Sequence, residues 1–354
     1  MQPLSTEVQA HRFVQIDEDG YFKMSEVRVC DVEIGRDWMK NVSFDPKSST
    51  VTAKIDNVET LVEAFDAPYV VLSAEKSAGR WIAHMPYGHS ENFELKSLSL
   101  DEWDRFHGVT ERGIPFVFSR SAQAGFFDLV EEYDDDSITD EGIQYEMKPW
   151  LESSSNVDTK FWNDSYVEGE TPWDTRQEFH PSLPRLVPPL KLMRSRVLVA
   201  GCGRGHDAAW FAQQGHIVTA IDYSAEAIKQ AKDLYGHIPD LTFVQADAFN
   251  LPQNFDKSFD IVFEHTLYCA ITPEKRNDLV KAWRRVLVDN GHLMAMMFAS
   301  EKRRGPPWGG SEWEIRHRLA KTFRVLYWQR LRDSVPKRLG SELFVYSQKL
   351  PALR

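Results

Sequence analysis

The sequence has few cysteines and no long apolar run. Only three of the 354 residues are cysteines, Cys30, Cys202 and Cys269, and none belongs to a CxxC pair. A disulfide framework and a cysteine-rich metal site are therefore excluded, and a reducing compartment fits best. No stretch reaches the roughly 18 apolar residues that a spanning helix needs, and residues 1–13 lack the apolar core of a signal peptide. We expect a cytoplasmic protein without a membrane segment.

Basic residues are scarce in the first half of the chain. Residues 1–150 contain 14 basic and 29 acidic side chains, a balance of −15, whereas residues 151–354 contain 28 and 24, a balance of +4. Because nucleic-acid binding needs a basic face that neutralises phosphates, we expect no nucleic-acid partner. The composition, 42% hydrophobic and 27% charged, is that of a folded protein, and the contrast between the halves predicts two domains.

The sequence pattern of the first half predicts a strand-rich domain. Short runs rich in Val, Ile and Tyr, among them VRVCDVEI, TVTAKI and YVVLSA, alternate with Asp, Gly, Asn and Ser, which is typical of strands and turns with a few helices. An acidic stretch at 131–142 and a polar, Ser-rich passage at 149–160 follow. We therefore predict an α+β domain of no identified family over residues 1–150 and a second domain over residues 151–354.

The second half alternates strands with helices. Apolar, β-branched segments suited to buried strands are RVLVAG, HIVTAID, LTFVQAD, FDIVFEH and HLMAMMF. Segments with helical spacing lie between them, so an α/β fold with a mostly parallel, Rossmann-like sheet is predicted. After HLMAMMF we expect a helix at SEWEIRHRLAKTF and a final strand near ELFVYSQKL, running antiparallel at the sheet edge.

A glycine-rich loop follows the first of these strands. Gly201, Cys202, Gly203 and Arg204 lead through a third glycine into a predicted helix, whose first turn contains Asp207. Glycines suit a tight turn where a ligand must lie against the backbone, so the loop is a candidate cofactor site. Such turns also occur without a ligand in doubly wound proteins. The loop alone therefore does not decide between a cofactor-binding loop and a purely structural turn.

Two carboxylates favour the cofactor reading. Asp222, next to Tyr223, closes the following strand 21 residues after the first glycine, where an acid can accept hydrogen bonds from both ribose hydroxyls. Asp247, next to Ala248, follows the third strand at the same edge of the sheet, within reach of an adenine amino group. The alternatives are a helix N-cap for Asp222 and a surface turn for Asp247.

The loop also indicates which nucleoside is bound. A dinucleotide fingerprint has its third glycine three positions after the second, and His206 stands there. A GxGxG loop suits a cofactor that lacks phosphates and carries an amino-acid group. We therefore expect S-adenosylmethionine.

Several separated motifs carry a family resemblance. They are FWNDSYVEGETPWD at 161–174, the loop and strand at 197–224, FDIVFEHTLYCAITPEKR at 259–276 and GPPWGGSEWEI at 305–315. With these segments, residues 160–350 resemble the thiopurine methyltransferase family, and TPWD and CAITP lie closest to its halide and thiol methyltransferase branch. The resemblance implies a class I methyltransferase fold with an antiparallel edge strand. It also implies cofactor contacts at Trp162 through Trp173, Gly201, Asp222, Asp247 with Ala248, and His265.

Methyl transfer to a thiol requires little acid–base catalysis from the protein. A thiol with a pKa near 8.5 yields enough thiolate in a modestly electropositive pocket, so no dedicated base is required. His265 is the catalytic candidate that would assist deprotonation or polarise the substrate; alternatively it orients the cofactor carboxylate or caps a helix. Glu264 would contact the cofactor amine or pair with a surface arginine. Trp162, Tyr166 and Trp173 flank a turn with Gly and Pro that would act as a lid, and their aromatic faces attract a sulfonium; the alternative is that they only pack.

We therefore expect a methyltransferase that acts on a small soft nucleophile, most simply a thiol. Halide or thiocyanate methylation is the alternative within the enzyme class. A regulatory or scaffold protein that senses the cofactor, with the acidic half binding a basic partner, is the alternative outside it. No metal site is assigned, since His84 and His89 lack the helical spacing of paired ligands.

Overall fold

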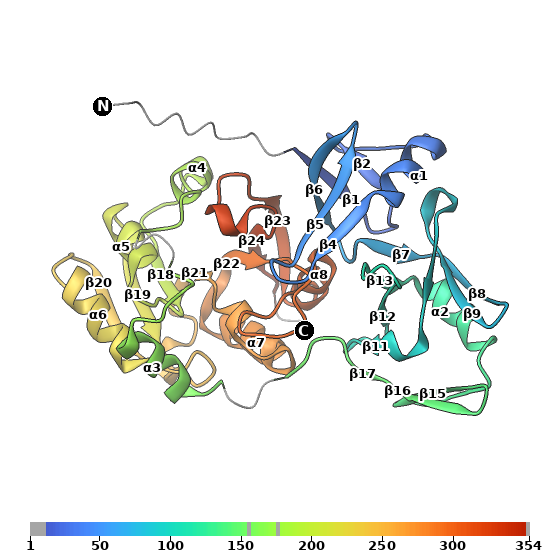
Figure 1. Ribbon diagram of the computed structural model, residues 1–354. Helices are drawn as coiled ribbons and strands as arrows, with labels where there is room; N and C mark the ends of the chain where they lie inside the picture. The colour runs from blue at the N-terminus through green and yellow to red at the C-terminus, as the bar shows by residue number, and fades with distance from the viewer. Residues whose placement is uncertain (1–11, 154–156, 175–177, 352–354) are drawn as a thin grey trace. The chain divides into compact units, whose positions relative to one another are not determined.

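The computed structural model describes residues 12–153, 157–174 and 178–351. It divides into two compact units, unit 1 (Met1–Trp150) and unit 2 (Leu151–Arg354) (Figure 1). No helix among the described residues has the length and apolar character that crossing a membrane requires.

The described residues of unit 1 form four sheets and two α-helices. Its elements are β1 (Phe13–Ile16), β2 (Phe22–Met24), β3 (Val27–Arg28), α1 (Val32–Lys40), β4 (Val42–Asp45), β5 (Thr50–Ile55), β6 (Val58–Ala64), β7 (Tyr69–Val71), β8 (Ser73–Ser77), β9 (Arg80–His84), β10 (Ser90–Phe93), β11 (Ser99–Leu100), β12 (Phe106–Val109), β13 (Pro115–Phe118), α2 (Arg120–Phe127), β14 (Glu132–Tyr133), β15 (Ser137–Asp140), β16 (Ile143–Glu146) and β17 (Lys148–Pro149). The larger sheets have the orders β3-β2-β1-β6-β5-β4 and β17-β11-β12-β13-β7. The strand-rich α+β prediction is thus confirmed.

One predicted strand run of unit 1 is wrong in part. The VRVCDVEI run forms only the two-residue strand β3 before the chain turns into α1. Asp31 stops the strand because its side chain accepts hydrogen bonds from the backbone N–H groups of Glu33 and Ile34, which is the geometry of a helix N-cap.

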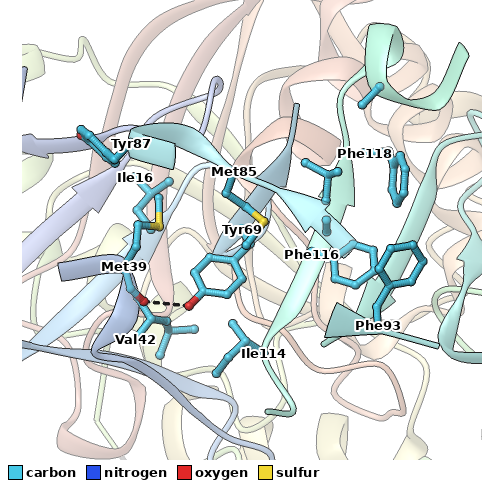
Figure 2. Packing of buried hydrophobic residues seen from close by; sticks show 14 of the residues in the cluster. Ile16, Met39, Val42, Tyr69, Met85, Tyr87, Phe93, Ile114, Phe116 and Phe118 are labelled. Carbon is cyan, nitrogen blue, oxygen red and sulfur yellow. Dashed lines mark hydrogen bonds between the residues drawn. The ribbon is translucent and has the colours of Figure 1, made fainter. Parts of the chain in front are cut away.

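An aromatic core holds unit 1 together. Figure 2 shows the rings of Phe93, Phe116 and Phe118 gathered beside Tyr69. The Tyr69 ring is fully buried, and its hydroxyl donates to the Met39 carbonyl oxygen at 2.8 Å. Such a hydrogen bond satisfies the one polar atom that an otherwise apolar ring brings into the core.

Unit 2 is a seven-stranded sheet with helices on both faces. Its elements are α3 (Thr159–Glu168), α4 (Leu183–Leu186), β18 (Arg196–Ala200), α5 (His206–Gln213), β19 (Ile217–Asp222), α6 (Ala225–Tyr235), β20 (Leu241–Gln245), β21 (Phe259–His265), α7 (Arg276–Val286), β22 (Leu287–Phe298), α8 (Glu312–Ala320), β23 (Phe323–Arg330) and β24 (Glu342–Lys349). The strand order is β20-β19-β18-β21-β22-β24-β23. β20 through β22 are parallel, and β24 and β23 are antiparallel to their neighbours. The predicted Rossmann-like, mostly parallel sheet is confirmed.

The end of the sheet differs from the expectation in one respect. The final strand β24 runs antiparallel, as predicted, but it lies between β22 and β23, so the edge strand is β23. The apolar pattern explains the arrangement, because β24 is buried along its length whereas Arg324 through Tyr327 of β23 are exposed. A strand buried on both faces belongs inside the sheet.

A hydrophobic core lies on each face of the unit 2 sheet, between the sheet and the helices that cover it. α5 and α6 pack on one face, where Phe211 meets Phe263, and α7 and α8 pack on the other, where Trp283 and Ile315 are buried. The strands β18, β19, β20 and β21 therefore all end at one carboxyl edge between the two helical layers (Figure 1). In a parallel sheet this edge is where ligands bind.

Candidate functional site

The glycine loop and the end of β19 are joined at the carboxyl edge. The loop glycines Gly201, Gly203 and Gly205 all have positive φ, at 66°, 51° and 82°, a region that favours glycine. The Gly203 amide donates to the Asp222 Oδ2 oxygen at 2.8 Å. The loop therefore holds its shape through a carboxylate on the neighbouring strand.

Asp222 has acceptor capacity to spare. Its Oδ1 oxygen accepts from the Ser224 amide at 2.9 Å, so both oxygens accept from backbone N–H groups. Burial raises the pKa of Asp222, against the lowering effect of these hydrogen bonds. Each carboxylate oxygen still offers a lone pair, and a vicinal diol such as ribose is the donor pair that suits them. Ser224, not Asp222, is the N-cap of α6.

Solvent reaches this edge although the strands behind it are buried. Gly201, Cys202, Gly203 and Asp222 are partly exposed, whereas the preceding strand residues are buried. Most other residues predicted to contact the cofactor are also partly exposed, namely Trp162, Trp173, Asp247, Ala248 and His265. Tyr223 is 42% exposed. Asp247 accepts hydrogen bonds from the Phe249 amide and the Asn250 side chain, as the surface-turn reading requires.

An aromatic cluster lies beside the glycine loop. Trp162 and Tyr166 come from α3, and the Trp173 ring meets both edge-on, with ring centroids 5.2 and 5.8 Å away. Trp173 Nε1 donates to the Tyr166 hydroxyl at 3.1 Å. An ideal Cβ on Gly203 would lie 2.6 Å from the Tyr166 hydroxyl oxygen, so the aromatic segment packs directly on the loop.

Arg204 ties the aromatic segment to the loop. Its guanidinium donates to Thr171 Oγ1 at 2.8 Å and pairs with Asp174, and its Nε donates to Gln230 of α6. The group also lies 5.5 Å from the Tyr166 ring centroid. One loop side chain therefore fixes the segment that precedes the first strand of the sheet, and this role of Arg204 was not predicted.

His265 pairs with the acid at the start of α5. Its Nδ1 lies 2.8 Å from Asp207 Oδ2, while Asp207 Oδ1 accepts from the His180 amide. Desolvation lowers the pKa of His265, but pairing with Asp207 and Glu342 outweighs it and raises the value to about 9. The contact with Asp207 therefore favours the protonated ring, a form that would stabilise an anion and would not accept a proton.

Glu342 and Arg338 complete a buried ionic cluster. The Arg338 Nη1 atom lies 3.1 Å from both His265 Nε2 and Glu342 Oε1, and its Nη2 donates to the Trp173 carbonyl. Glu342 is fully buried and also pairs with His180 at 3.0 Å. Desolvation raises the pKa of Glu342, but its contacts with His180, His265 and Arg338 outweigh this effect and hold the pKa well below its usual range. Arg338 can only donate, so its contact with His265 Nε2 is a hydrogen bond in the neutral ring, whereas in the protonated ring Glu342 Oε1, 3.7 Å from Nε2, is the acceptor. Arg338 is thus a permanent cation beside Trp173, joined by His265 when the ring is protonated.

Three side chains of this cluster have metal-ligand chemistry. His180, His265 and Glu342 bring one ligand atom each within 4.8 Å of one another. The Arg338 guanidinium already lies at hydrogen-bond distance from His265 and Glu342, and a bound cation would meet its charge. The arrangement is therefore better suited to an arginine-centred cluster than to a metal ion.

Glu264 does not form the surface salt bridge that the sequence suggested as one alternative. It is fully buried, its Oε2 accepts the Leu267 and Tyr268 amides at 3.1 Å, and its Oε1 has no partner among the described residues. A surface salt bridge is thus wrong, because the side chain belongs to the face of β21 that packs toward α7. Burial raises the pKa of Glu264 to about 7.

Sequence reasoning missed Arg338, Glu342 and His180 altogether. Asp207 was placed in the first turn of α5, where it lies, but its pairing with His265 was not predicted. The one available signal was the charge pattern of the final strand, which opens with an acid in an otherwise apolar run and so indicates a buried ion pair.

Comparisons with known proteins agree with this geometry. The model of the thiopurine S-methyltransferase family matches residues 157–352. Thiocyanate methyltransferase 1 of Brassica oleracea is 34% identical over 151 residues, 42% of this chain and 66% of that protein. The probable thiol methyltransferase 2 of Arabidopsis thaliana is 30% identical over 149 residues, 41% of this chain and 65% of that protein.

A bacterial relative and a solved structure are more distant. A thiopurine S-methyltransferase of Vibrio cholerae is 25% identical over 177 residues, 45% of this chain and 79% of that protein. A Burkholderia thailandensis 1,6-didemethyltoxoflavin-N1-methyltransferase, solved with S-adenosylhomocysteine, has a TM-score of 0.46 and 21% identity and covers 63% of this chain and 99% of that one. The chain thus spans just under two thirds of the plant relatives, and the family match does not extend to residues 1–156.

Proposed function

Because the chain belongs to the thiopurine S-methyltransferase family, we propose that residues 151–354 form an S-adenosylmethionine-dependent methyltransferase domain that methylates a small thiol. The observation that carries the proposal is the hydrogen bond from Gly203 to Asp222 at the carboxyl edge of the sheet, beside the His265 and Arg338 cations. The substrate is a small molecule and not a nucleic acid, and the three free cysteines are consistent with a cytoplasmic setting.

The residues at the edge suit an adenosyl group. Asp222 has acceptor capacity for both ribose hydroxyls, and Asp247 with Ala248 follows the next strand, where the adenine would lie. The partly exposed glycines Gly201 and Gly203 allow a close approach to the backbone. Tyr223, 42% exposed, would pack against the base or the ribose.

The aromatic rings suit a sulfonium. Trp162 and Trp173 are partly exposed and lie next to the loop, so their faces can attract a positive sulfur and exclude water from it. When bound, S-adenosylmethionine supplies an electrophilic methyl group and leaves as the neutral thioether, S-adenosylhomocysteine.

His265 and Arg338 would prepare the nucleophile. A thiol must lose its proton before the sulfur attacks, and two adjacent cations lower the pKa of a thiol that lies beside them, so the proton passes to solvent. The sulfur–methyl bond then forms as the sulfonium–methyl bond breaks. Since the contact with Asp207 favours the protonated form of His265, we assign it to holding the thiolate and not to proton abstraction.

Thiocyanate or halide methylation is the second candidate. The cationic pair of His265 and Arg338 favours it, because both substrates are anions that need no deprotonation. The plant relatives carry the names of thiocyanate and thiol methyltransferases, so both acceptor types belong in the same assay.

The test starts with binding. We expect calorimetry on the full chain to detect S-adenosylmethionine and S-adenosylhomocysteine, and product analysis to find a methyl thioether with a panel of small thiols. Supplying thiocyanate or iodide distinguishes the second candidate through methyl thiocyanate or methyl iodide. Absence of binding to either nucleoside contradicts the proposal. Binding without turnover on any acceptor, together with recovery of one stoichiometric protein partner, would instead support a cofactor-sensing regulator.

A further inference from the structure

Unit 1 contains a cavity that the methyl-transfer chemistry does not use. Its volume is about 720 Å³, within the range of small-molecule sites. It lies between the C-terminal half of α1, the segment that enters β10 and the turn between β12 and β13. The lining residues are Arg36, Lys40, Gly88, His89, Ser90, Glu91 and Arg112.

The cavity has the opposite charge to the domain around it. Residues 1–150 contain 14 basic and 29 acidic side chains, yet three basic residues and one acidic residue line the cavity. Arg36, Lys40 and Arg112 thus concentrate positive charge in a unit whose overall field is negative. Charged walls of a concave surface focus the potential and attract ions of the opposite sign.

Arg36 is held in place by two partners and keeps one end free. Its Nε donates to the Tyr87 carbonyl oxygen at 2.9 Å, and its Nη1 pairs with Glu33 at 3.0 Å. The Nη2 atom lies over Gly88, where an ideal Cβ would come within 3.2 Å of it. The guanidinium is therefore oriented before any ligand arrives, with N–H groups left to donate.

Arg112 is oriented in the same way. Its Nη2 donates to the Val42 carbonyl oxygen at 2.8 Å, and its Nη1 pairs with Glu91. Glu91 is itself only 10% exposed and also contacts His89 at 3.0 Å. Hydrogen bonds from both partners and the charge of Arg112 keep the pKa of Glu91 below its usual range, although burial opposes them. One largely buried carboxylate thus fixes Arg112 and His89 together.

Lys40 is the uncompensated charge of the cavity. It is exposed at the end of α1 and has no ion-pair partner in the part of the chain that the structure describes. Its ammonium group offers three donors. Arg36 and Lys40 lie one helical turn apart, so both side chains leave the same face of α1.

The backbone beside the cavity is strained. Tyr87 is buried with φ at +60°, a conformation that a bulky side chain rarely adopts. The Tyr87 ring packs on Gly35 of α1, where an ideal Cβ would lie 2.2 Å from it. This contact fixes α1 against the turn that carries the Tyr87 carbonyl, and so fixes Arg36. Strain of this kind persists where the surrounding structure enforces it and gathers at ligand sites.

We propose that this cavity binds a small organic anion through Arg36, Lys40 and Arg112. Two oriented guanidinium groups recognise a phosphate or a carboxylate, whose oxygens accept parallel N–H bonds. The volume leaves room for an organic body attached to a phosphate or to several carboxylates. The site belongs to unit 1 and is independent of the function proposed for unit 2.

The test uses the full chain with two probes, pyrophosphate and citrate, which separate a phosphate preference from a carboxylate preference. We expect calorimetry to detect binding of at least one probe, with an affinity that falls as salt is added. Lys40→Gln should weaken it at least fivefold, and Arg36→Gln with Lys40→Gln at least thirtyfold. Lys54→Gln is the matched control, because Lys54 is an exposed lysine of unit 1 outside the cavity, and it should leave the affinity unchanged.

Three results would overturn the proposal. One is the absence of binding by both probes at millimolar concentration. Another is binding that the double variant retains in full, and a third is equal weakening by Lys40→Gln and Lys54→Gln, which would indicate attraction to the general surface. Far-UV circular dichroism of each variant checks that unit 1 remains folded, and Arg36→Lys, which keeps the charge, should retain part of the affinity. Thiol methylation by Lys40→Gln should match that of the unchanged protein.

Discussion

Gly203 of the glycine loop and Tyr166 of α3 are packed so closely that the loop position has no room for a Cβ, which would lie 2.6 Å from the tyrosine hydroxyl oxygen. We predict that Gly203→Ala weakens binding of S-adenosylhomocysteine at least tenfold, because the loop must move off Tyr166. Adding Tyr166→Phe removes the hydroxyl and should restore part of the affinity.

The positive φ of Gly203 contributes separately to this loss. Gly215→Ala controls for it, because Gly215 has φ at +89° and nothing within 4 Å of an ideal Cβ. This variant should lower stability by about 1 kcal/mol through backbone strain and leave binding unchanged. Calorimetry measures all four proteins, and no recovery on adding Tyr166→Phe would contradict the packing explanation.

Replacing the acid at the end of β19 should weaken binding of the nucleoside cofactor. Asp222→Ala removes a charged acceptor that the Gly203 amide uses and that two ribose hydroxyls would use, so we expect a loss of about 1–3 kcal/mol in binding free energy. Isothermal calorimetry with S-adenosylhomocysteine measures it. Asp233→Ala, an exposed acid of α6, is the control and should bind normally. Equal affinities for both variants would remove Asp222 from the site.

Removing the acid that pairs with His265 should lower the histidine's pKa. Asp207 contributes both a charge and a hydrogen bond to the raised value of about 9, so Asp207→Asn should move the pKa of His265 toward its ordinary 6.5. NMR titration of the histidine ring resonances follows the change. His216, whose pKa is lowered by burial alone, serves as the internal control. An unmoved His265 would show that Asp207 does not set its charge.

Stability should decrease as the solution becomes alkaline. The folded-state pKa of His265 exceeds its unfolded value, so its contribution is complete below pH 6.5 and is lost as the pH rises through about 9. We expect the unfolding free energy of unit 2 to fall by on the order of 2 kcal/mol over this interval. Denaturant titrations at several pH values, on the native protein and on His265→Asn, measure it. The variant should lack the His265 part of the decline, and identical slopes would contradict this origin.

The charge of Arg338 should matter most for an anionic acceptor. Arg338→Met should lower kcat/KM for thiocyanate at least tenfold and move the pH optimum for a thiol upward, because one of the two cations beside Trp173 is lost. Arg338→Lys should recover part of the thiocyanate rate. Lys337 is an exposed neighbour of Arg338, and Lys337→Met should change neither kcat/KM for thiocyanate nor the pH optimum for a thiol. A loss that is the same for every acceptor and pH would indicate a structural role only.

The sequence was sufficient to predict the parts of unit 2 that depend on local pattern. The strand that ends at Ala200, the glycine loop and the acid at Asp222 are neighbours along a repeating strand–helix unit, so their spacing fixes their places at one edge of the sheet. The position of the last strand could not be predicted in the same way. An antiparallel strand can pair on one side at the edge, where water satisfies its outer N–H and C=O groups, or on both sides inside the sheet, and the packing of its two faces decides between them.

The ionic cluster could not be predicted for a different reason. His265 lies 58 residues from Asp207 and 73 residues from Arg338 in the chain, and no local pattern relates such distant charges. Burial makes their pairing necessary, because an unpaired charge costs far more free energy inside a protein than on its surface. Which partners meet depends on the tertiary fold, and Glu264 shows that an adjacent residue can face the opposite side of the sheet.

The segments around the proposed acceptor site come from outside the nucleoside-binding strands and loops. Trp173 precedes the first strand of the sheet and Arg338 precedes the last, and one hydrogen bond joins them. Mutations in the segment before β24 can therefore change which acceptor is preferred without altering the strand-end residues proposed to contact the nucleoside, so that new acceptor specificities can evolve on an unchanged cofactor site.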